Sequence, residues 1–180
     1  MFGRAGALND AEELFWELQR EQRRPHSHDN RRIGVGTWTA MIGVYGEHKL
    51  AKKALSLFEK MTFAAAECSE ERIKPNEVTL CAVLSACSRA SLVHSALEIV
   101  RTMRSRYGVS PSGIHHNCIT DALGRAGRLE EAETYLLVNL VDHHSKNDLV
   151  VAWMALLGAC RIHGDTSREE RAEQRSARPQ

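Results

Sequence analysis

The chain has no hydrophobic run that approaches the ~18 consecutive apolar residues of a membrane-spanning helix, so no such segment is expected. Its formal net charge of +1 gives no global basic field to attract nucleic acid, and such binding would need a local stripe of charge. Its five cysteines are odd in number, and no two of them have C-x-x-C spacing. A disulfide framework or a cysteine-rich zinc site is therefore not expected, and a reducing compartment fits better.

Enzyme motifs are missing as well. The chain contains neither the H-x-E nor the C-x-x-C pattern of a zinc-dependent base deaminase, no G-x-x-x-x-G-K-[ST] phosphate loop and no G-x-S-x-G elbow. The histidine pairs 115–116 and 143–144 have no cysteine or carboxylate at matching ligand spacing. We therefore predict a protein that is not an enzyme and that holds no metal and no cofactor.

A ten-residue pattern recurs four times and ends each time in alanine. The copies are FGRAGALNDA (2–11), YGEHKLAKKA (45–54), CSRASLVHSA (87–96) and LGRAGRLEEA (123–132). A second pattern runs in phase with it, as TWTAMIGVY (37–45), TLCAVLSAC (79–87), HHNCITDAL (115–123) and AWMALLGAC (152–160). Repetition at this period is typical of supersecondary units that must stack on one another to bury their apolar faces.

Each unit has two halves in which apolar residues fall at helical spacing. Trp38, Met41, Ile42 and Tyr45 follow the i, i+3, i+4, i+7 pattern of one helix face, and the second half of the unit repeats that pattern. A turn residue stands between the halves, at Gly6, Lys49, Ser91, Gly127 and Gly164. No segment alternates with period two. The sequence therefore predicts an all-α fold, an α-solenoid of stacked helix-turn-helix repeats.

Several repeat positions are predicted to pack inside the units. The closing alanines should allow a close crossing of two helices, since a larger side chain there would overpack the contact. Cys87 and Cys160, at equivalent positions, are interpreted as small buried hydrophobes. The residues at one equivalent first-helix position are expected to be core packers: Trp38, Leu80, His116 and Trp153.

The phased motifs resemble pentatricopeptide repeats, specifically the plant-type arrays that mix long and short variants. The motifs that carry the resemblance are TWTAMIGVY, KPNEVTLCAVLSACSRASLV, YGVSPS, DALGRAGRLEEAE and WMALLGACRIHGD, and they cover about residues 1–165. The last of them is similar to the extension motif that follows the repeats in this family. Since both ends depart from complete members, and the first residues already belong to a repeat, we expect a fragment or a truncated array with no visible signal or transit peptide.

The resemblance implies the following organisation. Residues 1–34 are a partial first repeat, mainly its second helix, followed by a basic linker, and 35–76 are a repeat with an insertion. Residues 77–112 are a long-type repeat and 113–149 another repeat. Residues 150–165 begin the extension motif, and 166–180 are expected to form a frayed or disordered tail because apolar periodicity is lost there. No polar capping helix is evident, so the open ends should expose apolar surface.

Members of this family bind single-stranded RNA with about one base per repeat. The fifth and last residues of a repeat select the base, and the second residue is a wedge that sandwiches it. The corresponding pairs here are Thr39 with Asn76, Cys81 with Ser112, and Asn117 with Asp148; the wedges are Gly36, Val78 and Ile114. By resemblance the first pair favours adenine, the second has weak preference and the third favours uracil. Counting back from Trp153 makes Leu149 the last residue of the third repeat, although Asp148 suits the pattern better.

Each reading position also has a structural interpretation. Asn76 follows Pro75 and is suited to cap the next helix, Asn117 fits a solvated first turn, and Cys81 fits packing. Five basic residues near turns are candidates for phosphate contacts, although a solvated face is the commoner role for any one of them: Lys52, Lys53, Arg89, Arg125 and Arg128.

The sequence therefore leads to a functional hypothesis with one alternative. The hypothesis is sequence-specific binding of single-stranded RNA by modular repeats, in editing or processing of transcripts in a mitochondrion or chloroplast, with editing or processing factors as further partners. Three readable units are too few to select a unique site, so binding by this chain alone should be weak. The alternative is a helical scaffold that binds protein or associates with itself through exposed ends, although the W-x-x-L-G-x-x-Y pattern of tetratricopeptide repeats is absent.

Overall fold

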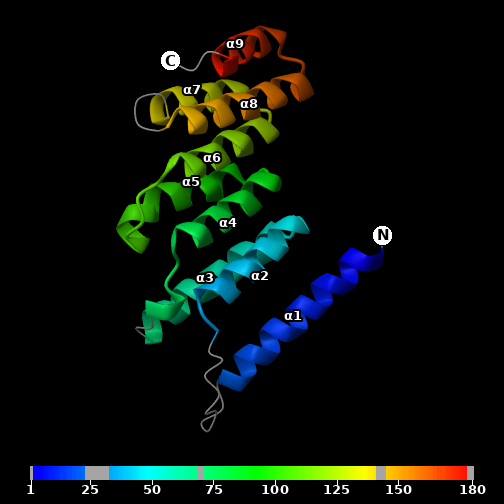
Figure 1. Cartoon of the computed structure of the whole chain (residues 1–180), viewed down its shortest axis with the longest axis vertical. Helices are drawn as coiled ribbons and strands as arrows, with labels where there is room; N and C mark the ends of the chain where they lie inside the picture. Colours follow the sequence, from blue (N-terminus) through cyan, green and yellow to red (C-terminus); the bar gives the residue numbers. More distant parts are fainter. Residues whose placement is uncertain (1, 23–32, 69–70, 141–144, 178–180) are drawn as a thin grey trace. The chain divides into compact units, whose positions relative to one another are not determined.

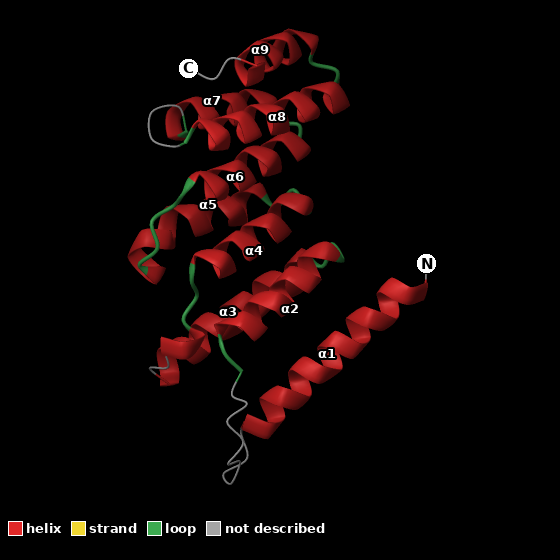
Figure 2. Cartoon of the chain, viewed as in Figure 1, coloured by secondary structure: helices red, strands yellow, loops and turns green. Residues whose placement is uncertain are grey.

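The computed structural model describes residues 2–22, 33–68, 71–140 and 145–177. Within these ranges every regular element is a helix (Figures 1 and 2). The elements are α1 (Phe2–Gln22), α2 (Val35–Glu47), α3 (Ala51–Cys68), η1 (Glu71–Ile73), α4 (Glu77–Arg89), α5 (Val93–Thr102), η2 (Met103–Tyr107), α6 (Gly113–Arg125), α7 (Leu129–Asn139), α8 (Lys146–His163) and α9 (Thr166–Ala177). In the described part of the chain, no helix is both long and apolar enough to span a bilayer.

The chain divides into two compact units, which we call the N-terminal unit (Met1–Ala86) and the C-terminal unit (Cys87–Gln180). In the N-terminal unit α2 packs against both α1 and α3. The ring of Trp38 meets the ring of Phe15 edge-on, with centroids 5.2 Å apart, and Ile42 and Met61 are fully buried beside them. The apolar faces predicted from the repeat therefore form the core of this unit.

The C-terminal unit is built from α5 to α9, which follow one another as stacked pairs in Figure 1. Helix α6 packs against α5, α7 and α8, and α9 packs against α8. The core includes Ile119, Leu136 and Leu156, all fully buried. All four predicted core packers are buried as well, which confirms that interpretation for Trp38, Leu80, His116 and Trp153.

The turns between paired helices share one backbone conformation. Lys49, Ser91, Gly127 and Gly164 all have positive φ, between 54° and 74°. The sequence placed a turn at each of these positions, and the left-handed conformation explains why two of them are glycine. The predicted turn at Gly6 is wrong, because α1 runs without interruption through that residue. Alanine, leucine and glutamate dominate the segment, and their helix propensity offsets the cost of a glycine within it.

Small residues mark the closest approach between successive first helices. A Cβ atom added to Gly46 would lie 3.0 Å from the Cβ of Ala86, and one added to Gly124 would lie 2.8 Å from the Cβ of Ala159. The two contacts use the same repeat positions, once in each unit. Of the four closing alanines, Ala54, Ala96 and Ala132 are fully buried, as predicted, whereas Ala11 is half-buried. The Gly–Ala crossing was not predicted, although the recurring glycine was visible in the sequence.

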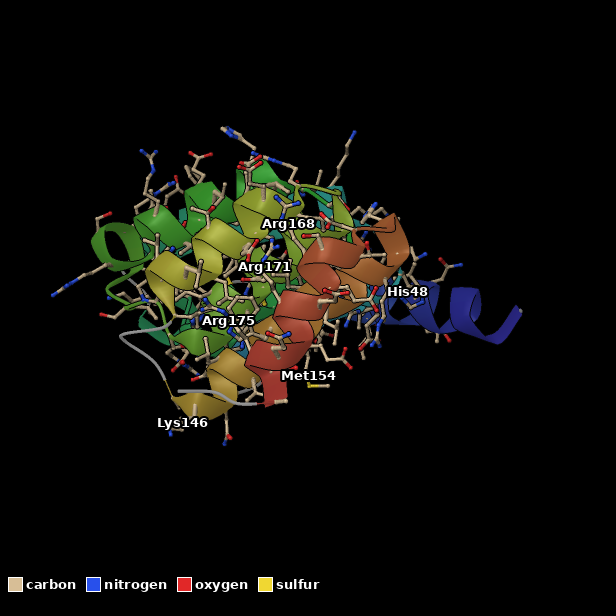
Figure 3. All side chains as sticks on the ribbon, turned by 90° about the horizontal axis from the view of Figure 1, so that it is seen from above. His48, Lys146, Met154, Arg168, Arg171 and Arg175 are labelled. Carbon is tan, nitrogen blue, oxygen red and sulfur yellow. The ribbon has the colours of Figure 1, made fainter. Side chains whose placement is uncertain are left out.

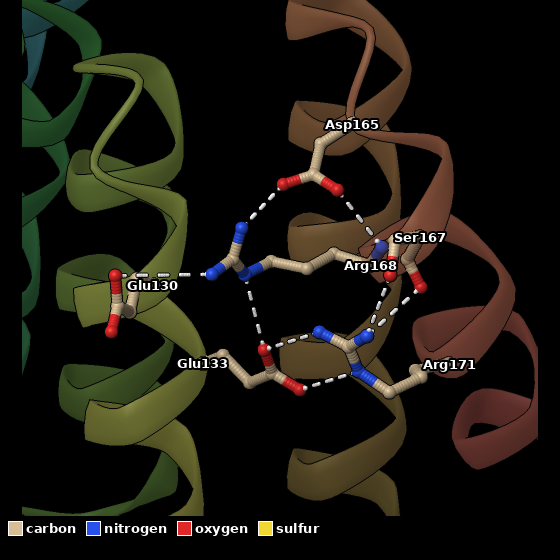
Figure 4. Close-up of polar contacts among 6 residues, drawn as sticks. All are labelled: Glu130, Glu133, Asp165, Ser167, Arg168 and Arg171. Carbon is tan, nitrogen blue, oxygen red and sulfur yellow. Dashed lines mark hydrogen bonds and ion pairs between the residues drawn. The ribbon is translucent and has the colours of Figure 1, made fainter.

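The tail expected at 166–180 is a helix from Thr166 to Ala177, so that expectation is wrong for those residues. Helix α9 docks through the buried Ala172 and through Arg175, whose guanidinium lies 5.2 Å from the ring centroid of Trp153. Arg168 and Arg171 both bind the carboxylate of Glu133 on α7, at 3.2 Å each (Figure 4). Arginine–carboxylate contacts therefore take part in holding this helix, and a search for apolar periodicity does not detect them. It supplies the polar covering that the sequence analysis did not find at this end.

The remaining domain boundaries stay predictions. In the repeat at 35–76, where an insertion is predicted, α3 extends to Cys68 and Glu71–Ile73 form η1. Most of the basic linker that was expected at 20–34 lies outside the described residues. Cys87 and Cys160 are fully buried as predicted, and burial raises the pKa of the Cys87 thiol to about 11, so it stays protonated at neutral pH.

Candidate nucleic-acid interface

Asn76 caps helix α4, as its sequence context indicated. Its side-chain Oδ1 accepts the backbone N–H of Thr79 at 3.0 Å, and its own carbonyl accepts the N–H of Leu80 at 3.0 Å. The Thr79 hydroxyl also donates to Asn76 Oδ1, at 3.0 Å. Because a backbone N–H can only donate, these contacts identify the oxygen of the Asn76 amide and leave its Nδ2 group at the exposed side.

Thr39 is joined to Asn76 through Thr79. The two threonine Oγ1 atoms lie 2.7 Å apart, and Thr79 is fully buried while Thr39 is half-buried. Since the Thr79 proton goes to Asn76, the Thr39 hydroxyl donates to Thr79. The structure therefore brings the first predicted pair together, through a residue that the sequence analysis missed. Its signal was the spacing of a capping box, with Asn76 followed by Thr79 three residues later.

The third predicted pair has a different arrangement. Asp148 lies at the start of α8, where its backbone N–H and its carboxylate both contact the Ser145 hydroxyl, at 3.2 and 2.6 Å. A Cβ atom added to Gly113 would overlap the Asp148 carboxyl group. Gly113 and Asn117 are one turn apart on α6, so Asp148 packs against the helix face that carries Asn117. Leu149 is buried in the C-terminal unit, which favours Asp148 as the predicted last residue of the third repeat.

The Oδ1 atom of Asn117 is buried and has no hydrogen-bond partner among the described residues. The register of the repeat explains this. Helix α4 carries Thr79 one residue before Leu80, whereas α8 carries the buried Ala152 one residue before Trp153. The residue on α8 that corresponds to Thr79 is therefore an alanine, which offers Asn117 no hydroxyl such as the one that Thr39 contacts.

The second predicted pair is split between the units, since Cys81 belongs to the N-terminal unit and Ser112 to the C-terminal unit. Cys81 is half-buried. Ser112 begins α6 in a capping box, in which its backbone N–H donates to Nδ1 of the buried His115 at 3.1 Å. Ser112 therefore has a clear structural role, and any base contact would be additional.

The predicted wedges Val78 and Ile114 are 64% and 54% exposed, unusual values for β-branched apolar side chains on packed helices. Gly36, the third wedge position, faces open space. On α8 the wedge position is Val151 and the fifth position is Met154, which are 53% and 59% exposed. Both were missed in the sequence, although counting from Trp153 locates them. Met154 projects from the opposite side of the C-terminal unit to Arg168 (Figure 3).

Several basic residues proposed for phosphate contacts are already paired. Lys53 Nζ lies 2.7 Å from Glu12 Oε1, Arg125 Nε lies 2.9 Å from Asp121, and Arg128 pairs with Glu131. The hydrogen bond from Lys53 holds the pKa of Glu12 below its usual value, and burial together with Glu12 raises the pKa of Tyr45 to about 12. The pair of Lys53 joins α3 to α1, whereas each of the other two pairs is local to one helix, and all three cations are less available to RNA.

Comparison with known proteins identifies the class of protein. The PPR repeat family model matches residues 36–63, and the pentatricopeptide repeat domain model matches 64–126. The chain belongs to the pentatricopeptide repeat family, whose repeats imply a helical solenoid. Neither matching model describes an enzyme domain.

Three pentatricopeptide repeat-containing proteins of Arabidopsis thaliana illustrate the similarity. A chloroplastic one is 37% identical over 178 residues, which is 99% of this chain and 19% of the relative. Another is 40% identical over 131 residues, 73% of this chain and 24% of the relative. A mitochondrial one is 34% identical over 172 residues, 96% of this chain and 19% of the relative. The chain thus spans about a fifth to a quarter of the length of these relatives.

Proposed function

We propose that the chain binds single-stranded RNA base by base through its repeats, in organellar RNA editing or processing. The main supporting observation is that hydrogen bonds through Thr79 connect Thr39 with Asn76. Thr79 directly follows Val78, the wedge position of the next repeat. The names of the chloroplastic and mitochondrial relatives support an organellar location. We further propose that the repeats are of the type that mixes long and short variants, that residues 150–165 begin an extension motif, and that editing or processing factors are partners.

Hydrogen-bond accounting supports adenine at the first pair. Thr39 uses its proton on Thr79, so its oxygen can accept, while the Nδ2 group of Asn76 can donate. The Watson–Crick edge of adenine presents an amino donor beside a ring-nitrogen acceptor, which complements this pair. Cytosine presents the same order on a smaller ring, so size must supply the remaining discrimination. At Asn117 and Asp148, uracil is proposed from the family pattern alone.

The test is binding of the 180-residue chain to a pool of short single-stranded RNAs and to matched duplexes, at two salt concentrations. Bases of a single strand are open to side chains and those of a duplex are not, so we expect a preference for the single strand. We also expect affinity to fall as salt rises. Equal binding to single strands and duplexes would reject the proposal.

The scaffold alternative is supported by exposed apolar side chains on second helices, including Phe63 on α3 and Val138 on α7. Such side chains suit protein contacts or self-association. Sedimentation of the chain without RNA, at the same two salt concentrations, distinguishes the two. Self-association that is insensitive to salt, in a chain that does not bind RNA, would favour the scaffold.

A further inference from the structure

A cluster of three arginines follows α5 in the C-terminal unit. Arg101 lies in the last turn of α5, and Arg104 and Arg106 lie in the π-helical segment η2. All three are exposed, whereas Met103 between them is fully buried. The chain then turns at Gly108, which has a φ of 70°, and reaches Ser112, where α6 begins. We call Arg101, Arg104 and Arg106 the η2 cluster.

The η2 cluster differs from most other arginines of the same unit. Arg125, Arg128, Arg161, Arg168 and Arg171 each pair with a carboxylate. Among the described residues, no carboxylate lies within ion-pair distance of an η2-cluster arginine; Arg106 instead lies 5.8 Å from the ring centroid of Tyr107. Three positive charges thus lie on one short segment, and none of them forms an ion pair with a described residue.

A purely structural role for the cluster would be to stabilise the end of its helix, since cations are favourable near a helix C-terminus. That role would be expected to recur along the array. Among the other second helices, α1 and α9 each have one basic residue in the last turn, Arg20 and Arg175, whereas α3 and α7 have none. A single cation at the helix end can therefore be structural, but a cluster of three arginines is local to this repeat.

We propose that the η2 cluster binds the phosphate backbone of single-stranded RNA, an inference that rests on the proposed function. Exposed guanidinium groups donate paired hydrogen bonds to phosphate oxygens. Residues 108–111 join the cluster directly to Ser112, the predicted last residue of its repeat, so it lies where the predicted readers of α6 begin. In a chain of net charge +1, these three exposed charges supply a local basic field.

The test compares two triple variants that lose the same charge. R101Q/R104Q/R106Q removes the η2 cluster, and the control R20Q/R161Q/R171Q removes three other exposed arginines, none of which is a candidate RNA contact. Binding of a fluorescent 12-nucleotide single-stranded RNA of mixed sequence is measured by anisotropy over a salt series. Since each phosphate contact on a single strand contributes about 0.7 to the salt slope, the cluster variant should lose about 2 from it. We expect roughly a tenfold or greater loss of affinity at low salt, against less than twofold for the control.

Equal losses in both variants would indicate a general effect of net charge and would overturn the inference. An unchanged salt slope in the cluster variant would overturn it too. If wild type binds single strands and duplexes equally, the proposed function itself fails, and that result is visible before any variant is made. Thermal melting checks the folding of both variants. If the triple variant melts early, the single variants R101Q, R104Q and R106Q replace it, each expected to lower the slope by about 0.7.

Discussion

In the N-terminal unit the hydroxyl of Thr39 bonds to Thr79, and Thr79 bonds to Asn76. In the C-terminal unit the Oδ1 atom of Asn117 is buried without a partner among the described residues. Thr39 and Asn117 hold the same repeat position. The difference arises on the following first helix, which carries Thr79 in one unit and Ala152 in the other. The polar environment of a predicted base-reading position therefore depends on the next repeat, and side chains at the same repeat position need not have the same number of hydrogen-bond partners.

The largest expected effect tests the close contact in the C-terminal unit. The G113A variant places a methyl group where the Asp148 carboxyl group lies, so we expect a loss of about 1–3 kcal/mol in the free energy of unfolding. Urea denaturation followed by circular dichroism measures it. In a D148A background the clash disappears, and G113A should become neutral or slightly stabilising because alanine favours helix. A similar loss in both backgrounds would show that Asp148 does not fill this site.

The next effect breaks the network of the N-terminal unit. The T79V variant keeps the shape of the side chain but removes the hydroxyl that joins Thr39 to Asn76, and we expect it to cost about 1–2 kcal/mol of unfolding free energy. If the network orients the first pair, adenine preference at one position should fall as well. T120V is the matched control, since Thr120 is a fully buried threonine whose hydroxyl donates to the carbonyl of His116 in its own helix. A loss of adenine preference in T120V would argue against a specific role for Thr79.

These two contacts also show what the sequence could predict and why. Helical periodicity revealed the helix pairs, and the left-handed turns at Gly127 and Gly164 were visible as glycines. The capping role of Asn76 followed from the residues next to it in the chain. The link from Thr39 to Thr79 joins residues that are distant in the sequence, and only the stacking of helices brings them together.

Two predictions near the ends of the chain were wrong because they relied on the apolar repeat pattern alone. Helix α9 was missed because it docks by charge pairs and one buried alanine, and apolar periodicity does not report such contacts. The continuity of α1 was missed because the repeat pattern suggested a turn at Gly6, and local helix propensity prevailed over that pattern. Pattern analysis was therefore reliable where apolar faces drive packing and failed where charge or propensity decides.

A smaller pair of effects compares the two asparagines directly. N76A removes a helix cap and should cost about 1 kcal/mol of unfolding free energy. N117A removes a buried acceptor that lacks a partner, so we expect between no change and a gain of about 1 kcal/mol. Both should weaken base discrimination if both residues read RNA. Equal destabilisation by the two variants, in parallel denaturation curves, would mean that Asn117 makes contacts equivalent to those of the cap.

The smallest effect on stability accompanies a change of specificity. T39N gives the N-terminal unit the residue that the C-terminal unit has at the same position, and the Asn Nδ2 group can still donate to Thr79, so unfolding free energy should change by less than about 0.5 kcal/mol. The preference at one base should move from purine toward pyrimidine, because the amide can accept from a base as well as donate. Competition between RNAs that differ at one nucleotide measures the shift, and the reciprocal N117T should move its own position toward purine. If neither exchange alters the preference, residues 39 and 117 do not select the base, and the difference between the two units concerns packing alone.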